Sequence, residues 1–258
     1  MKITIIGVGN MGSAIARGFI ADKENAFQVC ISNRSTERLE LLKAESPAFL
    51  VEPDFQRAVA FADLVVLAVK PWAMQSVLES VEFHPHQILM SVAAGISFEE
   101  LNQWTVGTTN LYRVIPNTAI ALNKSMNLIS SYQNITEIDK LVLDLFTRFG
   151  ASVLIGEEKM AAATSISSCG IAYLFKYIQA AMQAGIELGL TPAEAKKMAA
   201  QAAIGAGEII LSDENSHPSA EIDKVTTPGG LTIKGINELD KQGFSSAIIE
   251  AIKRSTVD

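Results

Sequence analysis

The sequence predicts an α/β protein: a Rossmann-like, doubly wound, mostly parallel sheet, followed by an all-helical C-terminal domain. Through about residue 155, short β-branched runs alternate with helical stretches, which is typical of βαβ units. The runs are apolar at successive positions, as expected of parallel strands that helices cover on both faces. After Gly156, apolar residues recur at helical spacing. We therefore predict an α/β domain over residues 1–156 and a helical domain over residues 157–258.

The strands of the first domain and one helix start of the second are predicted from local patterns. In the second domain, Thr191-Pro192-Ala193-Glu194 combines an N-cap threonine, a first-turn proline and a capping-box glutamate, so a helix begins there. The Ala-rich helices around residues 199–206 carry a wide apolar arc. Either a second subunit covers this arc or helices of the same chain bury it. The predicted strands are Ile3–Ile6, Gln28–Ile31, Leu64–Val69, Ile88–Val92, Leu111–Val114, Met126–Ile129 and Ser152–Ile155.

Composition excludes several classes of function. The 258 residues are 48% hydrophobic, enough for a full-sized core. The net charge of −7, without a block of Lys and Arg, argues against nucleic-acid or membrane partners. Cys30 and Cys169 are too few for a disulfide framework, and His84, His86 and His217 lack metal-ligand spacing. We therefore expect no metal site and a reducing, cytoplasmic location. No run is long enough to cross a bilayer.

A glycine motif follows the first predicted strand. The segment GVGNMG stands directly before the helical pattern Asn10–Ile20, and that strand-to-helix context makes a dinucleotide site a good prediction. The first glycine allows a tight turn, the second lets a pyrophosphate approach the backbone, and the third packs the helix on the strand. The candidate cofactor-binding residues here are Gly7, Gly9, Asn10, Met11 and Gly12.

The end of the second predicted strand indicates which nucleotide is bound. NAD-dependent proteins hold the ribose hydroxyl there with an acidic side chain. In this chain the position reads Ser32-Asn33-Arg34-Ser35, with no carboxylate to repel a 2′-phosphate. Because the guanidinium of Arg34 can form two hydrogen bonds with a phosphate, we predict NADP, with Ser32, Asn33 and Arg34 as ligands. The alternative for Arg34 is a solvated side chain near a helix start.

Two further loops are candidates for contact with the cofactor. They are Ala68-Val69-Lys70-Pro71 and Ala93-Ala94-Gly95, after the third and fourth predicted strands. Ligands of open α/β sheets bind beyond the carboxyl ends of the strands, so both loops are expected at that edge. Small residues there would let the ribose and the nicotinamide lie against backbone, and Lys70 would add a positive charge. Each loop taken alone is equally consistent with ordinary turn chemistry.

A third glycine-containing turn lies near the C-terminus, in VTTPGGLTIKGI at residues 225–236. Pro228 fixes its own φ angle, and Gly229 and Gly230 place no side chain over their amides. Such a turn leaves backbone N–H groups open at a helix start, where the unpaired donors and the helix dipole both favour an anion. An ordinary helix-initiating turn is the alternative.

Taken together, these stretches resemble one family, the pyrroline-5-carboxylate reductases. That resemblance implies an oxidoreductase of proline biosynthesis, which reduces 1-pyrroline-5-carboxylate to L-proline with NADPH or NADH. It also implies a homodimer or higher homo-oligomer formed through the C-terminal helices. The segments that carry the resemblance run nearly from end to end: IIGVGNMGSAI, SNRS, LAVKPWAMQSVL, SVAAGIS, YRVIPNT, GIAYLFKYIQAAMQAGIELGL and VTTPGGLTIKGINELDKQGF.

The resemblance also implies roles for the residues of the C-terminal turn. In the family, backbone amides of the Pro-Gly-Gly turn hold the substrate carboxylate, and a threonine two positions beyond it contacts the imine nitrogen. Carried over, the amides are those of Gly229, Gly230 and Leu231, and the threonine is Thr232. Thr232 is therefore the candidate catalytic residue, with a small imino acid as the substrate.

The chain departs from the family pattern at a few positions. Ser168-Cys169-Gly170-Ile171 stands where the family usually has Gly-Ser-Gly-Pro, and Ala119 where a proline often follows Asn-Thr. Phe55 replaces an asparagine that commonly approaches the adenosine, and Leu231 is larger than in many relatives. Two alternatives to pyrroline-5-carboxylate reduction therefore remain: reduction of a related cyclic imine acid, such as a six-membered ring, and nucleotide binding without catalysis.

Overall fold

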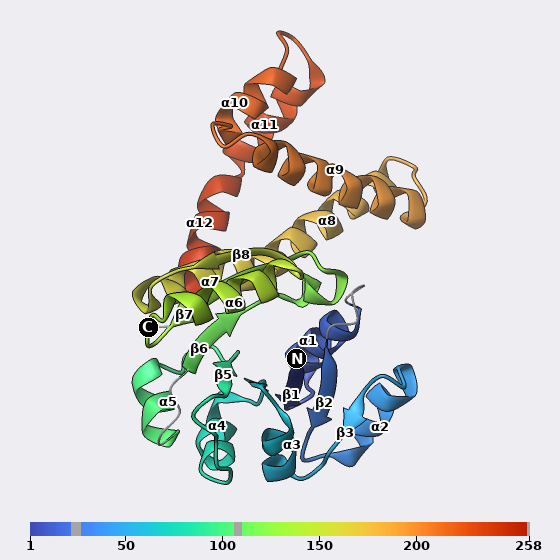
Figure 1. Cartoon of the computed structure of the whole chain (residues 1–258). Helices are drawn as coiled ribbons and strands as arrows, with labels where there is room; N and C mark the ends of the chain where they lie inside the picture. The colour runs from blue at the N-terminus through green and yellow to red at the C-terminus, as the bar shows by residue number, and fades with distance from the viewer. Residues whose placement is uncertain (22–26, 106–109, 257–258) are drawn as a thin grey trace. The chain divides into compact units, whose positions relative to one another are not determined.

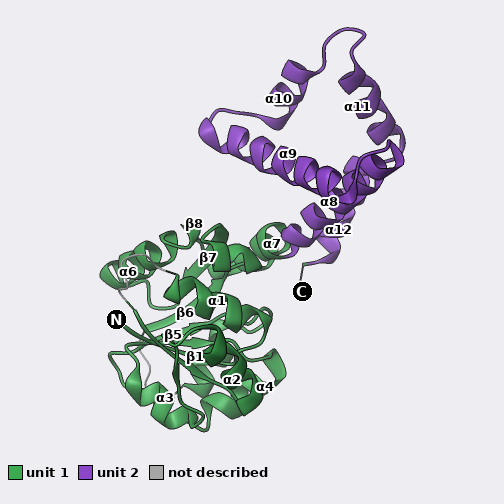
Figure 2. Ribbon diagram, turned by 90° about the vertical axis from the view of Figure 1, so that its right-hand side faces the viewer, with its two compact units in different colours: residues 1–168, 256–258 green, residues 169–255 purple. Residues whose placement is uncertain are grey.

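The computed structural model describes residues 1–21, 27–105 and 110–256, and it divides into two compact units. Unit 1 comprises Met1–Ser168 with Thr256–Asp258, and unit 2 comprises Cys169–Ser255 (Figure 2, green and purple). Unit 1 holds the sheet, whereas every helix or strand assigned within the described unit 2 is a helix (Figure 1).

Unit 1 is built on an eight-stranded sheet with the order β3-β2-β1-β4-β5-β6-β7-β8. All neighbouring strands pair in parallel except β6 and β7, which are antiparallel. The first six positions have the Rossmann order 3-2-1-4-5-6, so the strand order reverses between β1 and β4. The strands are β1 (Lys2–Ile6), β2 (Gln28–Ser32), β3 (Leu50–Val51), β4 (Leu64–Leu67), β5 (Ile88–Ser91), β6 (Asn110–Ile115), β7 (Ser125–Ser131) and β8 (Gly150–Leu154).

Helices cover both faces of the sheet. On one face, α1 (Asn10–Ile20), α2 (Thr36–Glu45) and α6 (Thr136–Thr147) share a core. On the other, α3 (Phe55–Phe61), α4 (Pro71–Leu78) and α5 (Phe98–Trp104) share a second core with the alternate residues of the same strands. Ile5 of β1, for example, belongs to the first core and Ile6 to the second. The predicted doubly wound fold is confirmed, and so are all seven predicted strands.

Shorter helices complete unit 1. The 3-10 helix η1 (Thr118–Leu122) packs against α1, where a Cβ on Gly18 would lie 3.0 Å from the carbonyl oxygen of Ile120. After β8, the chain passes through η2 (Glu157–Lys159) into α7 (Met160–Thr164), whose Met160 is buried against Ile115 and Leu128. A π-helical turn, η3 (Ser165–Cys169), leads into unit 2.

Unit 2 consists of α8 (Gly170–Glu187), α9 (Pro192–Ser212), α10 (Pro218–Val225), α11 (Leu231–Lys241) and α12 (Phe244–Arg254). The predicted start of α9 is confirmed, because Thr191 and Glu194 form a reciprocal capping box. The Thr191 amide donates to Glu194 Oε2 at 2.9 Å, and the Glu194 amide donates to Thr191 Oγ1 at 3.4 Å. The pair α8 and α9 packs closely, since a Cβ on Gly185 would lie 2.9 Å from that of Ala195.

Candidate functional site

The glycine loop after β1 lies against the end of β4, at the reversal of strand order. Gly7 has φ +95°, and a Cβ there would lie 2.8 Å from the carbonyl carbon and oxygen of Ala68. A Cβ on Gly12 would overlap the carbonyl oxygen of Gly7. The first and third glycines are therefore required by the backbone itself.

The second glycine has a different role, because it leaves open space in front of α1. Gly9 is the N-cap of α1 and makes no side-chain capping bond. A Cβ there would have a single neighbour within 4 Å, Arg38 Nη1 at 3.7 Å, which is an ordinary contact distance. The first amides of α1 consequently face a space that a larger side chain would fill. This is the cradle that a pyrophosphate needs, so the loop fits a dinucleotide.

The turn after β2 is held against the glycine loop by Asn33. Its Oδ1 accepts a hydrogen bond from the Val8 amide at 3.2 Å, and its Nδ2 donates to the Ser35 carbonyl at 3.1 Å. Ser32 is fully buried, and its hydroxyl has no hydrogen-bond partner among the described residues. Asn33 therefore positions the turn, while Ser32 lies beneath it rather than on its surface.

Arg34 of this turn and Arg38 of α2 line one pocket. Arg34 and Arg38 are exposed, and no ion pair is found for either of them in the part of the chain that the structure describes. The cavity measures about 230 Å³, less than the roughly 300–1,000 Å³ typical of sites for a whole ligand. It suits one end of a dinucleotide. Its lining residues are Gly7, Gly9, Asn33, Arg34, Arg38, Phe55, Ala68, Val69, Lys70, Trp72, Ala73 and Val77.

The pocket unites many of the predicted cofactor residues with others that sequence reasoning missed. Gly7, Gly9, Asn33, Arg34, Ala68, Val69 and Lys70 line it, whereas Asn10, Met11, Gly12, Ser32, Pro71, Ala93, Ala94 and Gly95 do not. Arg38, Trp72, Ala73 and Val77 were not predicted. Arg38 stands in the first turn of α2, shortly after Arg34, and a second basic residue so soon after the end of β2 is a usable signal for a second phosphate ligand.

The loop after β5 lies at the carboxyl edge of the sheet, one strand away from β4. Ala93 is buried there, whereas Ala94 and Gly95 are exposed. Gly95 has φ +76°, a conformation that favours glycine. Its neighbours in the sheet end at the same edge, so this loop and the glycine loop share one side of unit 1.

The predicted substrate turn of unit 2 has the geometry of a type II turn over Thr227–Gly230. Gly229 follows Pro228 with φ +71°, and the Gly230 amide donates to the Thr227 carbonyl at 2.9 Å. Because the Gly230 N–H donates within the turn, it is not open to a ligand in the structure. Gly230 is also the N-cap of α11 and makes no side-chain capping bond.

The amides that follow the turn are the open ones. The first N–H groups of an α-helix have no acceptor within the helix, and those of α11 belong to Leu231 and Thr232. Both residues are exposed, Leu231 at 85%. Thr232 also borders a shallow, mainly apolar hollow along α11 with Ile236 and Leu239. The helix start therefore presents open donors and a hydroxyl group at one place.

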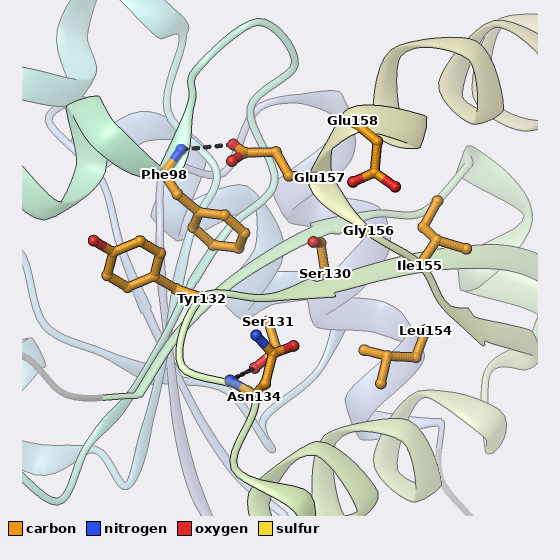
Figure 3. A pocket seen from close by; sticks show the side chains of 10 residues that line it. All are labelled: Phe98, Ser130, Ser131, Tyr132, Asn134, Leu154, Ile155, Gly156, Glu157 and Glu158. Carbon is orange, nitrogen blue, oxygen red and sulfur yellow. Dashed lines mark hydrogen bonds between the residues drawn. The ribbon is translucent and has the colours of Figure 1, made fainter.

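A further hollow lies near the end of β8, and none of the residues that line it is a predicted site residue (Figure 3). It has a polar, charged cluster at its rim: Arg113 Nη1 pairs with Glu157 Oε1 at 2.6 Å, and the same oxygen accepts from the Phe98 amide at 2.7 Å. The Arg113 guanidinium also lies 5.9 Å from the Phe98 ring centroid. These contacts tie the start of α5 to the turn after β8, so the cluster has a structural role.

Neither a metal centre nor a membrane span is found in the described residues. No group of three or more His, Cys, Asp or Glu side chains among them is arranged to hold a metal ion. None of the helices that the structure describes has the length and apolar character needed to cross a bilayer.

The glycine cradle at the reversal of strand order, with a basic pocket beside it, defines a dinucleotide-binding protein of the Rossmann class. A family model described as "Pyrroline-5-carboxylate reductase dimerisation" matches residues 157–258, and one described as "NADP oxidoreductase coenzyme F420-dependent" matches residues 2–95. The chain belongs to the pyrroline-5-carboxylate reductase family, as its full-length relatives establish. The predicted resemblance is confirmed.

The relatives come from distant organisms. The pyrroline-5-carboxylate reductase of Escherichia coli is 32% identical over 98% of this chain and 95% of its own length. Pyrroline-5-carboxylate reductase 1 of Dictyostelium discoideum is 35% identical over 98% of this chain, which spans 48% of that protein. A solved structure of the Plasmodium falciparum pyrroline carboxylate reductase with NADP bound is 26% identical, covers 99% of this chain and 95% of its own, and has a TM-score of 0.88.

Proposed function

We propose that this protein reduces 1-pyrroline-5-carboxylate to L-proline, with NADPH as the hydride donor. The observation that carries the proposal is the similarity to pyrroline-5-carboxylate reductases over nearly the whole chain, including the glycine loop and the Pro-Gly-Gly turn. The cradle before α1 and the basic pocket fit the adenosine and pyrophosphate portions of NADPH. Arg34 and Arg38 would bind the 2′-phosphate, and the pocket residue Lys70 would add positive charge.

The main task of the protein in this reaction is to orient the cofactor and the imine relative to one another. NADPH, when bound, supplies the hydride that adds to the carbon of the C=N bond. A protonated imine nitrogen eases that addition, and a five-membered cyclic imine is basic enough to be partly protonated near neutral pH. The amides at the start of α11 would hold the substrate carboxylate, with Thr232 aligning the nitrogen. Placing two reactants correctly is itself a large source of rate enhancement.

A related cyclic imine acid is the second candidate substrate. It is favoured by Ser168, which stands where the family usually has glycine. The Ser168 hydroxyl donates to the Pro116 carbonyl at 3.3 Å, and Asn117 Nδ2 donates to the Ser167 carbonyl at 3.3 Å. Asn117 and Ala119 belong to the YRVIPNT segment and the residues after it, so two departures from the family pattern lie close together. Because a glycine usually stands at this position in the family, we propose that the added side chain alters which rings the enzyme accepts.

One assay separates these functions. We expect NADPH oxidation, followed by absorbance, with both the five-membered and the six-membered imine acid, and a higher kcat/KM for the five-membered ring. A higher kcat/KM for the six-membered ring would favour the second candidate. NADPH binding without turnover of either ring would identify a non-catalytic relative.

We further propose that residues 157–258 form the substrate-binding and dimerisation domain. Among the described residues of α8 to α12, Ala195 alone is buried. Large apolar side chains are exposed along these helices, including Phe175 at 59% and Leu211 at 84%. Helices gain most of their stability by packing an apolar face, so we expect another protein surface to cover these exposed side chains. A second copy of the chain is the proposed partner.

We expect light scattering to report a mass at least twice the 27.7 kDa of one chain. Phe175→Glu should lower that mass, because it places a charge within the proposed interface. Gln103→Glu, at an exposed position of α5 in unit 1, introduces the same charge outside the proposed interface and is the matched control, which should leave the mass unchanged. A single-chain mass for the unmodified protein in dilute solution would contradict the proposal.

The two cysteines are free, which is consistent with a cytoplasmic location.

A further inference from the structure

Trp72 is the most exposed aromatic side chain at the nucleotide pocket. It stands in the first turn of α4, is 82% exposed and forms part of the pocket lining. Lys70 Nζ lies 6.0 Å from the centroid of a Trp72 ring. The large indole surface is therefore open to a ligand at this position.

Trp72 differs from the other aromatic residue of the pocket. Phe55 packs against the second core of unit 1, so part of its ring is already covered by protein. Trp72 belongs to none of the hydrophobic clusters. Its backbone is nevertheless fixed, since Pro71 occupies the first helical turn and the Ala73 amide donates to the Lys70 carbonyl at 2.9 Å. An indole with an open face on a fixed helix start is a rigid platform, because only two side-chain torsions must be ordered.

The chemistry around Trp72 matches the adenosine end of the cofactor. Apolar walls come from Phe55, Val69 and Val77, and the guanidinium groups of Arg34 and Arg38 line the same pocket. A ligand for this lining has a flat, aromatic body next to a phosphate. Adenine with a 2′-phosphorylated ribose has that form, and bases stack favourably on aromatic side chains.

We propose that Trp72 stacks on the adenine of NADPH and thereby sets the affinity of the pocket for the adenosine end. This inference rests on the proposed function, which supplies the ligand, but it concerns a residue that the glycine motif and the arginine turn do not include. Trp72 makes no contact with the reacting atoms in this proposal. It acts on binding alone.

The test uses the fact that the chain has two tryptophans, Trp72 and Trp104. The probe is 2′,5′-ADP, which carries the adenosine and the 2′-phosphate but no nicotinamide. Stacking on adenine should quench the fluorescence of Trp72. We expect 2′,5′-ADP to quench the emission of the unmodified protein and of Trp104→Phe, but not that of Trp72→Phe.

Affinity provides the second readout, measured by calorimetry with 2′,5′-ADP and NADPH. Trp72→Ala should raise both dissociation constants by the same factor, roughly 5- to 100-fold for the loss of one stacked base. Trp72→Phe keeps an aromatic face and should restore most of the affinity. Because Trp72 is exposed, thermal melting of Trp72→Ala should match that of the unmodified protein, which excludes a folding defect.

The outcomes distinguish this inference from the proposed function. If the unmodified protein binds NADPH while Trp72→Ala binds it equally well, and Trp72 emission does not respond to 2′,5′-ADP, then the stacking inference is wrong and the proposed function stands. If the unmodified protein binds neither NADPH nor 2′,5′-ADP, then both are wrong.

Discussion

Thr232→Ala is expected to lower kcat/KM for the imino acid roughly ten- to a few hundred-fold, the range for losing one well-placed hydrogen bond. The hydroxyl group is available for this role, since Thr232 is exposed at the start of α11 and no hydrogen bond from its side chain is found within the described chain. The dissociation constant of NADPH should stay unchanged, because the proposed role concerns the imine nitrogen alone. Steady-state kinetics and nucleotide binding together check both parts.

Two further variants make this test specific. Thr232→Ser retains the hydroxyl and should recover most of the activity. Thr226→Ala, six residues earlier, is the matched control, because the Thr226 hydroxyl already donates to the Ile222 carbonyl at 3.0 Å within its own helix end. It should leave kcat/KM unchanged. Full activity in Thr232→Ala would mean that the turn at residues 227–230 is an ordinary helix start.

The turn itself has a separable effect. Replacing Gly229, with φ +71°, by valine places a β-branched residue in a left-handed conformation and distorts the turn before α11. The amides of Leu231 and Thr232 would then lose their alignment on the carboxylate. KM for the imino acid should therefore rise and inhibition by proline should weaken, while the dissociation constant of NADPH stays unchanged.

The strands of unit 1 were predictable because parallel strands covered on both faces form continuous apolar runs. The strand missed was β3, which has only two residues and pairs with β2 at the edge of the sheet. A run of only two residues is too short to show the pattern of apolar residues from which a strand is predicted. Its existence depends on the parallel pairing of Cys30 with Leu50, a contact between residues far apart in the chain.

The direction of β7 was not predicted, although the length of the preceding connection contains that information. Periodicity is the same in either direction, so it does not distinguish parallel from antiparallel strands. The connection between Ile115 and Ser125 is shorter than the dozen or more residues that a parallel crossover requires. An antiparallel β7 follows from that length.

Like the strands, the candidate sites contain some residues that were predictable from the sequence and others that were not. The glycine cradle was predictable because two of its glycines are required by the nearby backbone: Gly7 has a positive φ, and Gly12 contacts the backbone of Gly7. Trp72 could not be predicted as a pocket residue, because its place depends on how α4 lies beside the turn after β2. The Gly230 amide was expected to be open, yet its bond to Thr227 appears only once the turn geometry is known.

Arg34→Asp is expected to weaken NADPH binding by about 2–3 kcal/mol, roughly 30- to 150-fold, if the guanidinium binds the 2′-phosphate through charged hydrogen bonds. NADH binding should change little, because NADH carries a hydroxyl group at that position and the new carboxylate can accept a hydrogen bond from it. The side chain is free to play this role, being exposed and without an ion pair in the described residues. Titration of the reduced nicotinamide fluorescence gives both dissociation constants.

A matched control separates this contact from a general change of charge. Lys140→Asp makes the same change of two charge units on α6 of the same unit, outside the pocket lining. It should leave both dissociation constants nearly unchanged, because exposed charges more than about 10 Å apart are largely screened at ordinary salt concentrations. Equal losses for NADPH and NADH in Arg34→Asp would instead mean that Arg34 binds the pyrophosphate, which the two cofactors share. Selectivity for the 2′-phosphate would then have to come from Arg38 or Lys70.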